Sequence, residues 1–306
     1  MYTNQFTNST ITLSFSGHET FPLRQMWIKK VVDMADSNHL IKKAKFNSIE
    51  FIAELGVGKN MLASMKHWAQ ACQIIEDHDS THFVLTEVAK TIFLHSGHDP
   101  YSENLSSTWL LHWRLAQKSE RATTCYWLFN RIHSGVFSKS ELQQQLSNLC
   151  SELGKATSLG SLTRDIDTIV RSYVPKSDLA AIEDSTDPVF GELGLIHHLN
   201  SDVYSFNRGP KSSLNLPLFL YIVLDYWRIS GRTDSTLSLD AIAYGEASPG
   251  RILKLDEDSI IAYLIQADDV SLGRIRWSDL AGIKQLSKQN CDVDMLMNEM
   301  LRKAYE

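Results

Sequence analysis

The sequence has 306 residues, of which 43% are hydrophobic and 22% are charged, and its mean hydropathy is −0.19. These values are typical of a soluble globular protein and exclude a fibrous or disordered chain. The formal net charge of −6 argues mildly against a protein that coats nucleic acid non-specifically, although a local basic patch can still bind DNA. The length predicts about two domains.

The chain carries neither a membrane span nor an export signal that we can recognise. Its most apolar run, residues 214–227, is too short to span a bilayer and is interrupted by Asn215, Pro217 and Asp225. Residues 1–17 lack the basic and apolar regions of a signal peptide. The four cysteines are widely spaced, so we expect reduced thiols rather than disulfides or a zinc site. We therefore expect a cytoplasmic protein that does not contact membranes.

The first folded unit, made of several helices and strands, is predicted over residues 48–94. Ser48 can cap a helix, residues 56–58 form a glycine turn, and a second helix begins at Lys59 with apolar residues on one face. Two β-prone runs, residues 72–77 and 81–86, are separated by a polar turn and predict a hairpin. Helix, glycine turn, helix and hairpin in this order are typical of a winged helix-turn-helix.

The same order of elements recurs twice. Ser138 and Glu141 form a capping-box pattern at the start of one helix, a second helix follows at about residues 161–174, and a hairpin surrounds residues 200–202. A weaker third copy covers residues 237–287. Between the first two copies lies a helical stretch whose large aromatic residues predict a core between domains: Trp109, Trp113, Trp127 and Phe129.

We therefore predict a mainly α protein with small β wings. Two or three winged helix-turn-helix units would surround an aromatic helical centre. The predicted domains are residues 1–135, with the first winged helix and the aromatic helices, residues 136–234, with the second unit, and residues 235–306, with a helical region that contains the third.

The densest polar cluster in the sequence lies within residues 15–30. His18 beside Glu19 offers a general base and a metal ligand, and Arg24 can bind a phosphate bidentately. Cleavage of a phosphodiester needs an activated nucleophile and cations that offset charge, so Mg²⁺ or Mn²⁺ is the expected cofactor, with His18 and Glu19 as ligands. The alternative is a purely structural connection between a strand and a helix, in which His18 and Glu19 cap the helix and Arg24 pairs with a buried carboxylate. The predicted catalytic residues are Ser16, His18, Glu19 and Arg24.

Basic residues at the start of the second helix of the first unit point to DNA contact. The segment beginning at Gly56 lacks the spacing of a phosphate-binding loop, which argues against an ATP site. At the start of a recognition helix, Lys59 and Asn60 would meet bases or phosphates. Asp165 and Asp167 would weaken such a role for the second unit, because carboxylates repel phosphates, and surface salt bridges are the alternative for this segment. A winged helix used only for packing or protein contact remains the alternative. The full set of predicted DNA contacts is Lys29, Lys30, Lys59, Asn60, Lys66, Arg164, Arg171, Arg208, Lys211, Arg251 and Lys254.

Several long motifs resemble a known family. FSGHETFPLRQMWIKK, LGVGKNMLASMKHWA, WLLHWRLA, RDIDTIVRSYVP and SPGRILKLDED, in this order, resemble the bacterial family catalogued as domain of unknown function 4007. The resemblance covers residues 15–285. It implies the DNA-nicking component of the Ssp type of single-stranded DNA phosphorothioation system, an antiphage defence, working with a cysteine desulfurase, an ATPase and an ATP-pyrophosphatase-like protein. The alternative is a non-catalytic DNA-binding or scaffold protein that recruits the other modification proteins.

Overall fold

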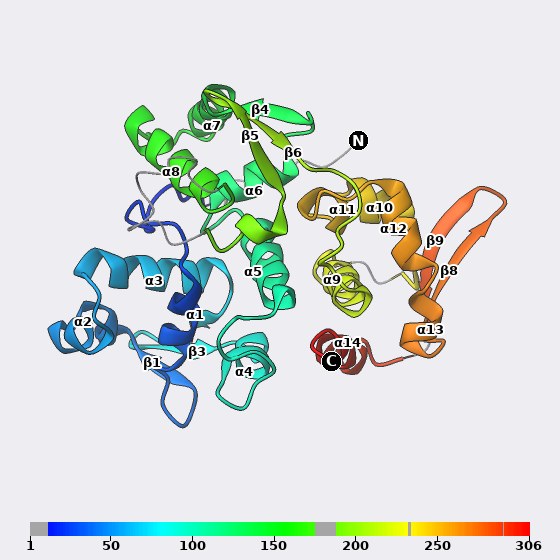
Figure 1. Ribbon diagram of the computed structural model, residues 1–306, viewed down its shortest axis with the longest axis horizontal. Coiled ribbons are helices and arrows are strands. Elements are labelled where there is room, and N and C mark those ends of the chain that lie inside the picture. Colours follow the sequence, from blue (N-terminus) through cyan, green and yellow to red (C-terminus); the bar gives the residue numbers. More distant parts are fainter. Residues whose placement is uncertain (1–11, 175–187, 232–233, 290) are drawn as a thin grey trace.

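Three small antiparallel sheets follow one another along the chain, with helices between them (Figure 1). This computed structural model describes residues 12–174, 188–231, 234–289 and 291–306. Within these residues each sheet has three strands, and the last strand of each lies in the centre: β1-β3-β2, β4-β6-β5 and β7-β9-β8. The prediction of a mainly α chain with small β elements is confirmed.

In the first unit a short strand is followed by the α-helices α2 and α3 and by a hairpin, and α1 and α4 flank them. Ser48 accepts hydrogen bonds from the backbone of Glu50 and Phe51, which confirms it as a helix cap, and Gly56 ends that helix in the left-handed conformation. The elements are α1 (Gln25–Val32), β1 (Leu40–Lys42), the 3-10 helix η2 (Lys43–Asn47), α2 (Ile49–Leu55), α3 (Lys59–Ala71), β2 (Ile75–Asp77), β3 (His82–Leu85) and α4 (Glu87–Phe93).

The second unit repeats this order. The capping box is present: Ser138 accepts from the backbone N–H of Glu141, whose carboxylate accepts from the backbone of Ser138. The hairpin turns at Ser201, as the sequence predicts. Its elements are β4 (Val136–Ser138), α7 (Lys139–Glu152), α8 (Leu159–Arg171), the 3-10 helix η4 (Gly191–Leu193), β5 (Ile196–Asn200) and β6 (Val203–Phe206).

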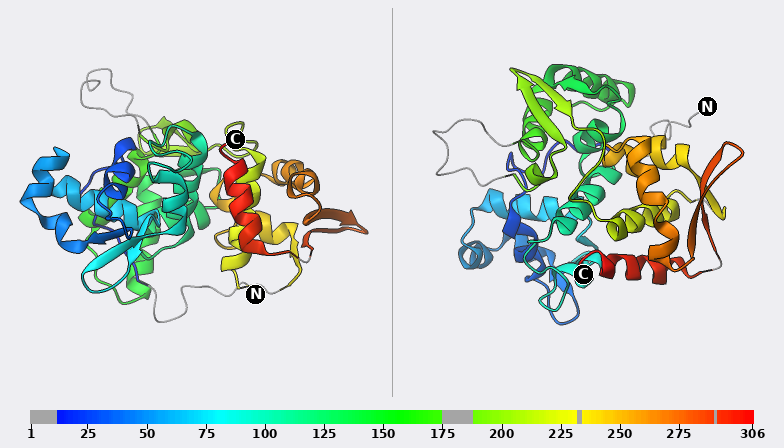
Figure 2. Two further views of the ribbon diagram at one scale, coloured as in Figure 1. Left: turned by 90° about the horizontal axis from the view of Figure 1, so that it is seen from below. Right: turned by 45° about the vertical axis from the view of Figure 1, so that its right-hand side comes forward.

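The third unit has shorter helices and a longer hairpin, which projects from the rest of the molecule (Figure 2). At the hairpin tip Leu280 pairs with Ile283, and both are mostly exposed, whereas the other two hairpins turn through polar residues. The elements are β7 (Thr236–Ser238), α10 (Leu239–Tyr244), α11 (Pro249–Ile252), α12 (Glu257–Leu264), α13 (Ala267–Ser271), β8 (Ile275–Leu280), β9 (Ile283–Lys288) and α14 (Val293–Lys303).

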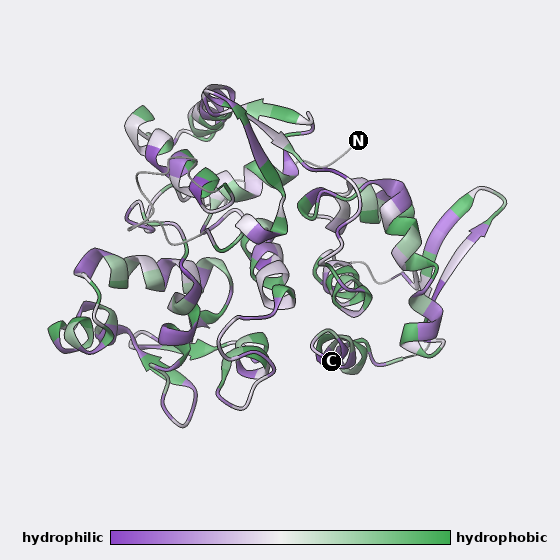
Figure 3. Cartoon of the chain, in the orientation of Figure 1, coloured by the Kyte–Doolittle hydropathy of each residue, from purple (hydrophilic) through white to green (hydrophobic). Residues whose placement is uncertain are grey.

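Three further helices form the centre of the molecule: α5 (Leu105–Gln117), α6 (Thr123–Asn130) and α9 (Leu216–Ile229). Trp109, Trp113 and Phe129 are buried here, and Trp127 is partly buried, which agrees with the predicted aromatic centre. Most residues of α9 are apolar, as the colouring in Figure 3 shows, and α14 packs against it. Buried side chains form one continuous core from Phe15 to Ala304.

One carboxylate lies inside this centre. Asp225 is fully buried and accepts hydrogen bonds from Trp113, Gln117 and Arg228, and it also pairs with Arg114 at 3.2 Å. Burial alone would raise the pKa of Asp225, but the ion pairs and hydrogen bonds hold it below its usual value.

Among the described residues, no helix combines the length and the apolar character that crossing a bilayer requires.

Candidate nucleic-acid interface

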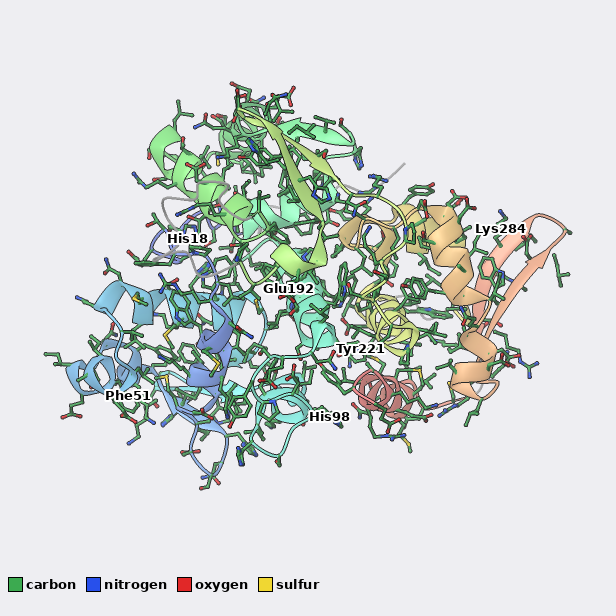
Figure 4. All side chains as sticks on the ribbon, in the orientation of Figure 1. His18, Phe51, His98, Glu192, Tyr221 and Lys284 are labelled. Carbon is green, nitrogen blue, oxygen red and sulfur yellow. The ribbon has the colours of Figure 1, made fainter. Side chains whose placement is uncertain are left out.

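A tight turn at residues 15–21 lies between α3 of the first unit and α8 of the second (Figure 4, around His18). Gly17, Glu19 and Thr20 have φ angles of 105°, 48° and 63°. Residues other than glycine rarely adopt this left-handed region, at a cost of about 1–3 kcal/mol each, and the surrounding structure must hold them there.

Three hydrogen bonds hold the turn. His18 Nε2 lies 2.6 Å from Asp165 Oδ1 on α8, and Arg171 on the same helix donates to the carbonyl of Thr20 at 2.8 Å. From the other side, Trp68 Nε1 on α3 donates to the carbonyl of Phe21 at 3.0 Å. The turn therefore links the last helix before the hairpin in each of the first two units.

The hydrogen bonds of His18 determine what its ring can do. Thr20 donates its backbone N–H to His18 Nδ1 at 3.1 Å, so this nitrogen is the acceptor. The proton of the neutral ring is then on Nε2, where it is donated to Asp165. Both nitrogens are occupied, and only 4% of the side chain is exposed. In this arrangement His18 positions the turn and has no lone pair left to act as a base or to bind a metal.

Aromatic packing completes the support beneath the turn. The ring of His18 contacts His67 edge-on at 5.6 Å between centroids and stacks on Trp68 at 6.2 Å. Burial, followed by the nearby His18, lowers the pKa of His67 to about 3, so its ring is neutral at physiological pH. A Cβ atom at Gly17 would lie 2.6 Å from His67 Nδ1, which leaves room only for glycine.

The other predicted catalytic residues lie around this support. Ser16 and Glu19 are exposed on the turn. Arg24 is partly buried, with its guanidinium carbon 5.7 Å from the ring centre of Phe21 and 5.5 Å from that of Trp27. In the described part of the chain, Arg24 has no carboxylate partner and no side chain caps the start of α1. A purely structural role for residues 15–30 predicted both, so that prediction also differs from the structure.

The described residues do not form a ready-made metal centre. Nowhere among them do three His, Cys, Asp or Glu side chains gather closely enough to hold an ion. Of the two predicted ligands, His18 is occupied on both nitrogens, and Glu19 is a single exposed carboxylate.

The predicted DNA contacts divide into three classes by exposure. Lys59, Asn60, Arg164 and Arg208 are exposed. Lys30, Lys66, Arg171 and Arg251 are partly buried; Lys30 donates to the carbonyl of Leu55, and Arg251 donates to that of Asn130. Lys29, Lys211 and Lys254 are buried, which keeps their ammonium groups away from a DNA backbone in this conformation.

The three buried lysines are satisfied inside the protein. Lys29 pairs with Asp33 at 2.6 Å. Lys211 donates to the carbonyls of Asn207, Gly209 and Lys254, and burial lowers its pKa to about 8. Lys254 donates to the carbonyl of Phe129, and burial holds its pKa well below the usual value.

Sequence reasoning missed the partners that give the turn its geometry. The sequence does not assign Asp165, His67 or Trp68 to the site, and for Asp165 it predicts either a charge that repels phosphate or a surface salt bridge. Because Asp165 is 5% exposed and bonded to His18, it presents little charge to the surface of α8. One usable signal was the spacing of α8, since Asp165 lies one turn from Leu162 and Ile169 on its apolar face.

Comparisons with known proteins agree over nearly the whole chain. Two solved structures, described as the SspB crystal structure and the magnesium ion-bound SspB crystal structure, each match with a TM-score of 0.85 and 28% identity, over 95% of this chain and 88% of theirs. No curated protein matches. The model of the family described as protein of unknown function DUF4007 matches residues 15–305. This chain therefore belongs to the DUF4007 family.

Proposed function

We propose that this protein binds DNA and nicks one strand within a phosphorothioation system of the Ssp type. The observation that carries the proposal is the likeness to SspB over 95% of the chain, with the strained turn at residues 15–21 as the candidate site. The proposed partners are DNA and the desulfurase, ATPase and ATP-pyrophosphatase-like proteins of such a system.

The sheet topology supports a winged helix-turn-helix in each unit. In every unit a short strand precedes two or more helices, and a hairpin then returns to pair with that strand. This is the element order of the winged helix. In such units α3 and α8 would be the recognition helices, and the proposed domains 1–135, 136–234 and 235–306 would each contain one sheet.

DNA contact is proposed along α3 and α8, on either side of the turn. Lys59 and Asn60 are exposed in the first turn of α3, where unpaired backbone N–H groups also favour phosphate. Arg164 is exposed on α8. The turn at residues 15–21 is hydrogen-bonded to both helices, and its residues Ser16 and Glu19 are exposed. In this proposal they lie within the surface that DNA covers.

The catalytic roles follow from exposure. Ser16 and Glu19 are the groups proposed to reach the phosphodiester, and Arg24, held over two aromatic rings, offsets its charge. His18 acts through its bonds to Thr20 and Asp165 and is a positioning residue.

Nicking of supercoiled plasmid by the purified protein tests the activity. We expect relaxed circles and a DNA gel shift, and repeating the assay with Mg²⁺, Mn²⁺ or EDTA shows whether nicking needs a metal ion. Glu19→Gln should bind DNA normally and nick about a hundred-fold more slowly, the scale of a lost acid–base group. Glu50→Gln, an exposed carboxylate on α2, is the matched control. Normal nicking by Glu19→Gln would remove the turn from the mechanism.

A non-catalytic DNA-binding or scaffold protein is the second candidate. The occupied nitrogens of His18 and the absence of a carboxylate or histidine triad among the described residues favour it. This function predicts a gel shift without relaxed plasmid at any metal concentration, and relaxed plasmid only when other proteins of the system are added.

A further inference from the structure

A second basic cluster lies away from the turn, where the second and third units meet. Three chain segments converge here: the end of α6, the residues after β6, and the residues after α11 (Figure 1). Gly209 donates its N–H to the carbonyl of Lys254 at 3.1 Å, and Lys254 Nζ donates to the carbonyl of Phe129 at 2.9 Å. Arg251 closes the arrangement by donating to the carbonyl of Asn130 at 3.0 Å.

Positive charge is concentrated at this junction. Lys254 is 1% exposed, and its Nζ lies 4.0 Å from the ring centre of Phe206. Arg208 and Arg251 are close enough to Lys254 to disfavour its charged form, in addition to the larger effect of burial. Burial and then the cations Arg251, Lys254, Arg131 and Arg208 lower the pKa of the surface residue His133.

Three carboxylates near the junction are already engaged, and one of them, Glu257, accepts from Tyr244, which lies within reach of the charge of Arg208. Glu246 accepts from Tyr126 and pairs with Arg131. Asp256 caps α12 by accepting from Ser259. Arg208 is exposed, and among the described residues no carboxylate pairs with it.

We propose that the junction binds a phosphate group, with Arg208 and His133 at its surface and Arg251 and the buried Lys254 behind them. Like charges brought together cost free energy, and a bound dianion or phosphodiester would remove that cost. The planar guanidinium of Arg208 presents two parallel N–H groups that match phosphate oxygens, and no carboxylate of the described residues competes for them through an ion pair.

The phosphate can come from a nucleic-acid backbone or from a free phosphate compound, and these sources share the same chemistry. The site does not depend on nicking, because it lies outside the turn. If a duplex occupies it, the inference deepens the proposed DNA binding by adding a contact of the second and third units.

Histidine NMR tests the site directly. The His133 resonance, assigned with His133→Asn, is followed over a pH titration with and without inorganic phosphate, pyrophosphate or a short DNA duplex. Binding should raise the pKa of His133 by about half a unit or more, because an anion favours the imidazolium. Arg208→Gln should remove the effect. Arg276→Gln, which deletes the same charge at another exposed position, should leave it.

Each outcome decides the proposal. A rise with the duplex, with or without phosphate, that Arg208→Gln abolishes supports the site and assigns it to the DNA backbone. A rise with phosphate or pyrophosphate alone supports the site and assigns it to a free phosphate compound. No rise with any ligand, or a rise that Arg208→Gln leaves unchanged, overturns the proposal. Plasmid binding by the wild type is measured in parallel, so failure of DNA binding is distinguished from failure of this site.

Discussion

Replacing Asp165 should release the turn that joins the first two units. Asp165 and His18 are 5% and 4% exposed, and their atoms lie 2.6 Å apart. Asp165→Leu leaves the Nε2–H of His18 buried without an acceptor. A hydrogen bond to a charged group contributes about 1.5–3 kcal/mol, and a buried donor left unpaired costs about 1–3 kcal/mol. We therefore expect the free energy of unfolding to fall by about 3 kcal/mol.

Two further variants separate this hydrogen bond from other effects of the substitution. Asp165→Asn keeps an oxygen that can accept from His18, so its loss should be about 1 kcal/mol. The double variant His18→Phe/Asp165→Leu removes both polar partners and should recover part of the loss, with a coupling free energy of at least about 1 kcal/mol. Asp167→Asn, two residues along α8 and ion-paired near the surface with Lys139, is the matched control and should cost less than about 1 kcal/mol.

Urea denaturation followed by tryptophan fluorescence measures these differences, and hydrogen exchange at the amide of Thr20 reports on the turn itself. Exchange at Thr20 should quicken in Asp165→Leu, because its acceptor His18 is no longer held. If Asp165→Leu loses no more stability than Asp167→Asn, or if the coupling free energy is below about 0.5 kcal/mol, the proposed role of the buried pair is refuted.

Three other expectations can be measured separately. Lys59→Ala should weaken duplex binding at every sequence and reduce the slope of log K against log salt concentration by about one. Lys284→Ala on the third hairpin should change neither. Equal slopes for Lys59→Ala and the wild type in anisotropy titrations would exclude α3 from the interface. Gly17→Ala should lower the melting temperature by several degrees, because φ is +105° and the new Cβ would meet His67; an unchanged melting curve would mean that the turn relaxes freely. Asp225→Asn should cost about 3–5 kcal/mol at pH 7. The pKa of Asp225 is lower in the folded than in the unfolded protein, so the carboxylate stabilises the fold above its unfolded-state pKa and stops doing so as pH falls through its folded-state pKa. The free energy of unfolding of Asp225→Asn should therefore decline less steeply with falling pH than that of the wild type. Parallel declines in the two proteins would contradict this.

Local sequence signals predicted most of the fold. The cap at Ser48, the capping box of Ser138 and Glu141 and the hairpin at Ser201 are all decided within a few residues, and all are present. These signals have a local physical basis, since caps and turns satisfy backbone groups of their own segment. The length of the third hairpin and the arrangement of the units depend on contacts between residues far apart in the sequence. Hydrophobic periodicity is a local pattern, so it does not predict those contacts.

The candidate site was predicted only in part. The density of polar residues identified residues 15–30, but the acceptor of His18 lies 147 residues away, at Asp165. A histidine and a glutamate side by side have the composition of a catalytic site whether or not the ring nitrogens are free. Only the tertiary structure shows that the backbone of Thr20 occupies one of them and Asp165 the other.

Burial is also what separates the basic residues of this chain. In the sequence, Arg208, Lys211 and Lys254 have the same formal charge and similar polar neighbours, and all three were predicted to contact DNA. In the fold, Lys211 bonds the second unit to the third and Lys254 bonds the third unit to the central helix α6, both through backbone carbonyls, while Arg208 remains exposed beside them. A buried ammonium cannot move to a phosphate without leaving those carbonyls unpaired, so it contributes to ligand binding only through the field that it adds behind Arg208. Lys211→Ala should therefore reduce the free energy of unfolding more than the free energy of DNA binding, whereas Arg208→Gln should do the reverse. Comparing the two losses in each variant shows whether a cation serves mainly the fold or mainly the ligand.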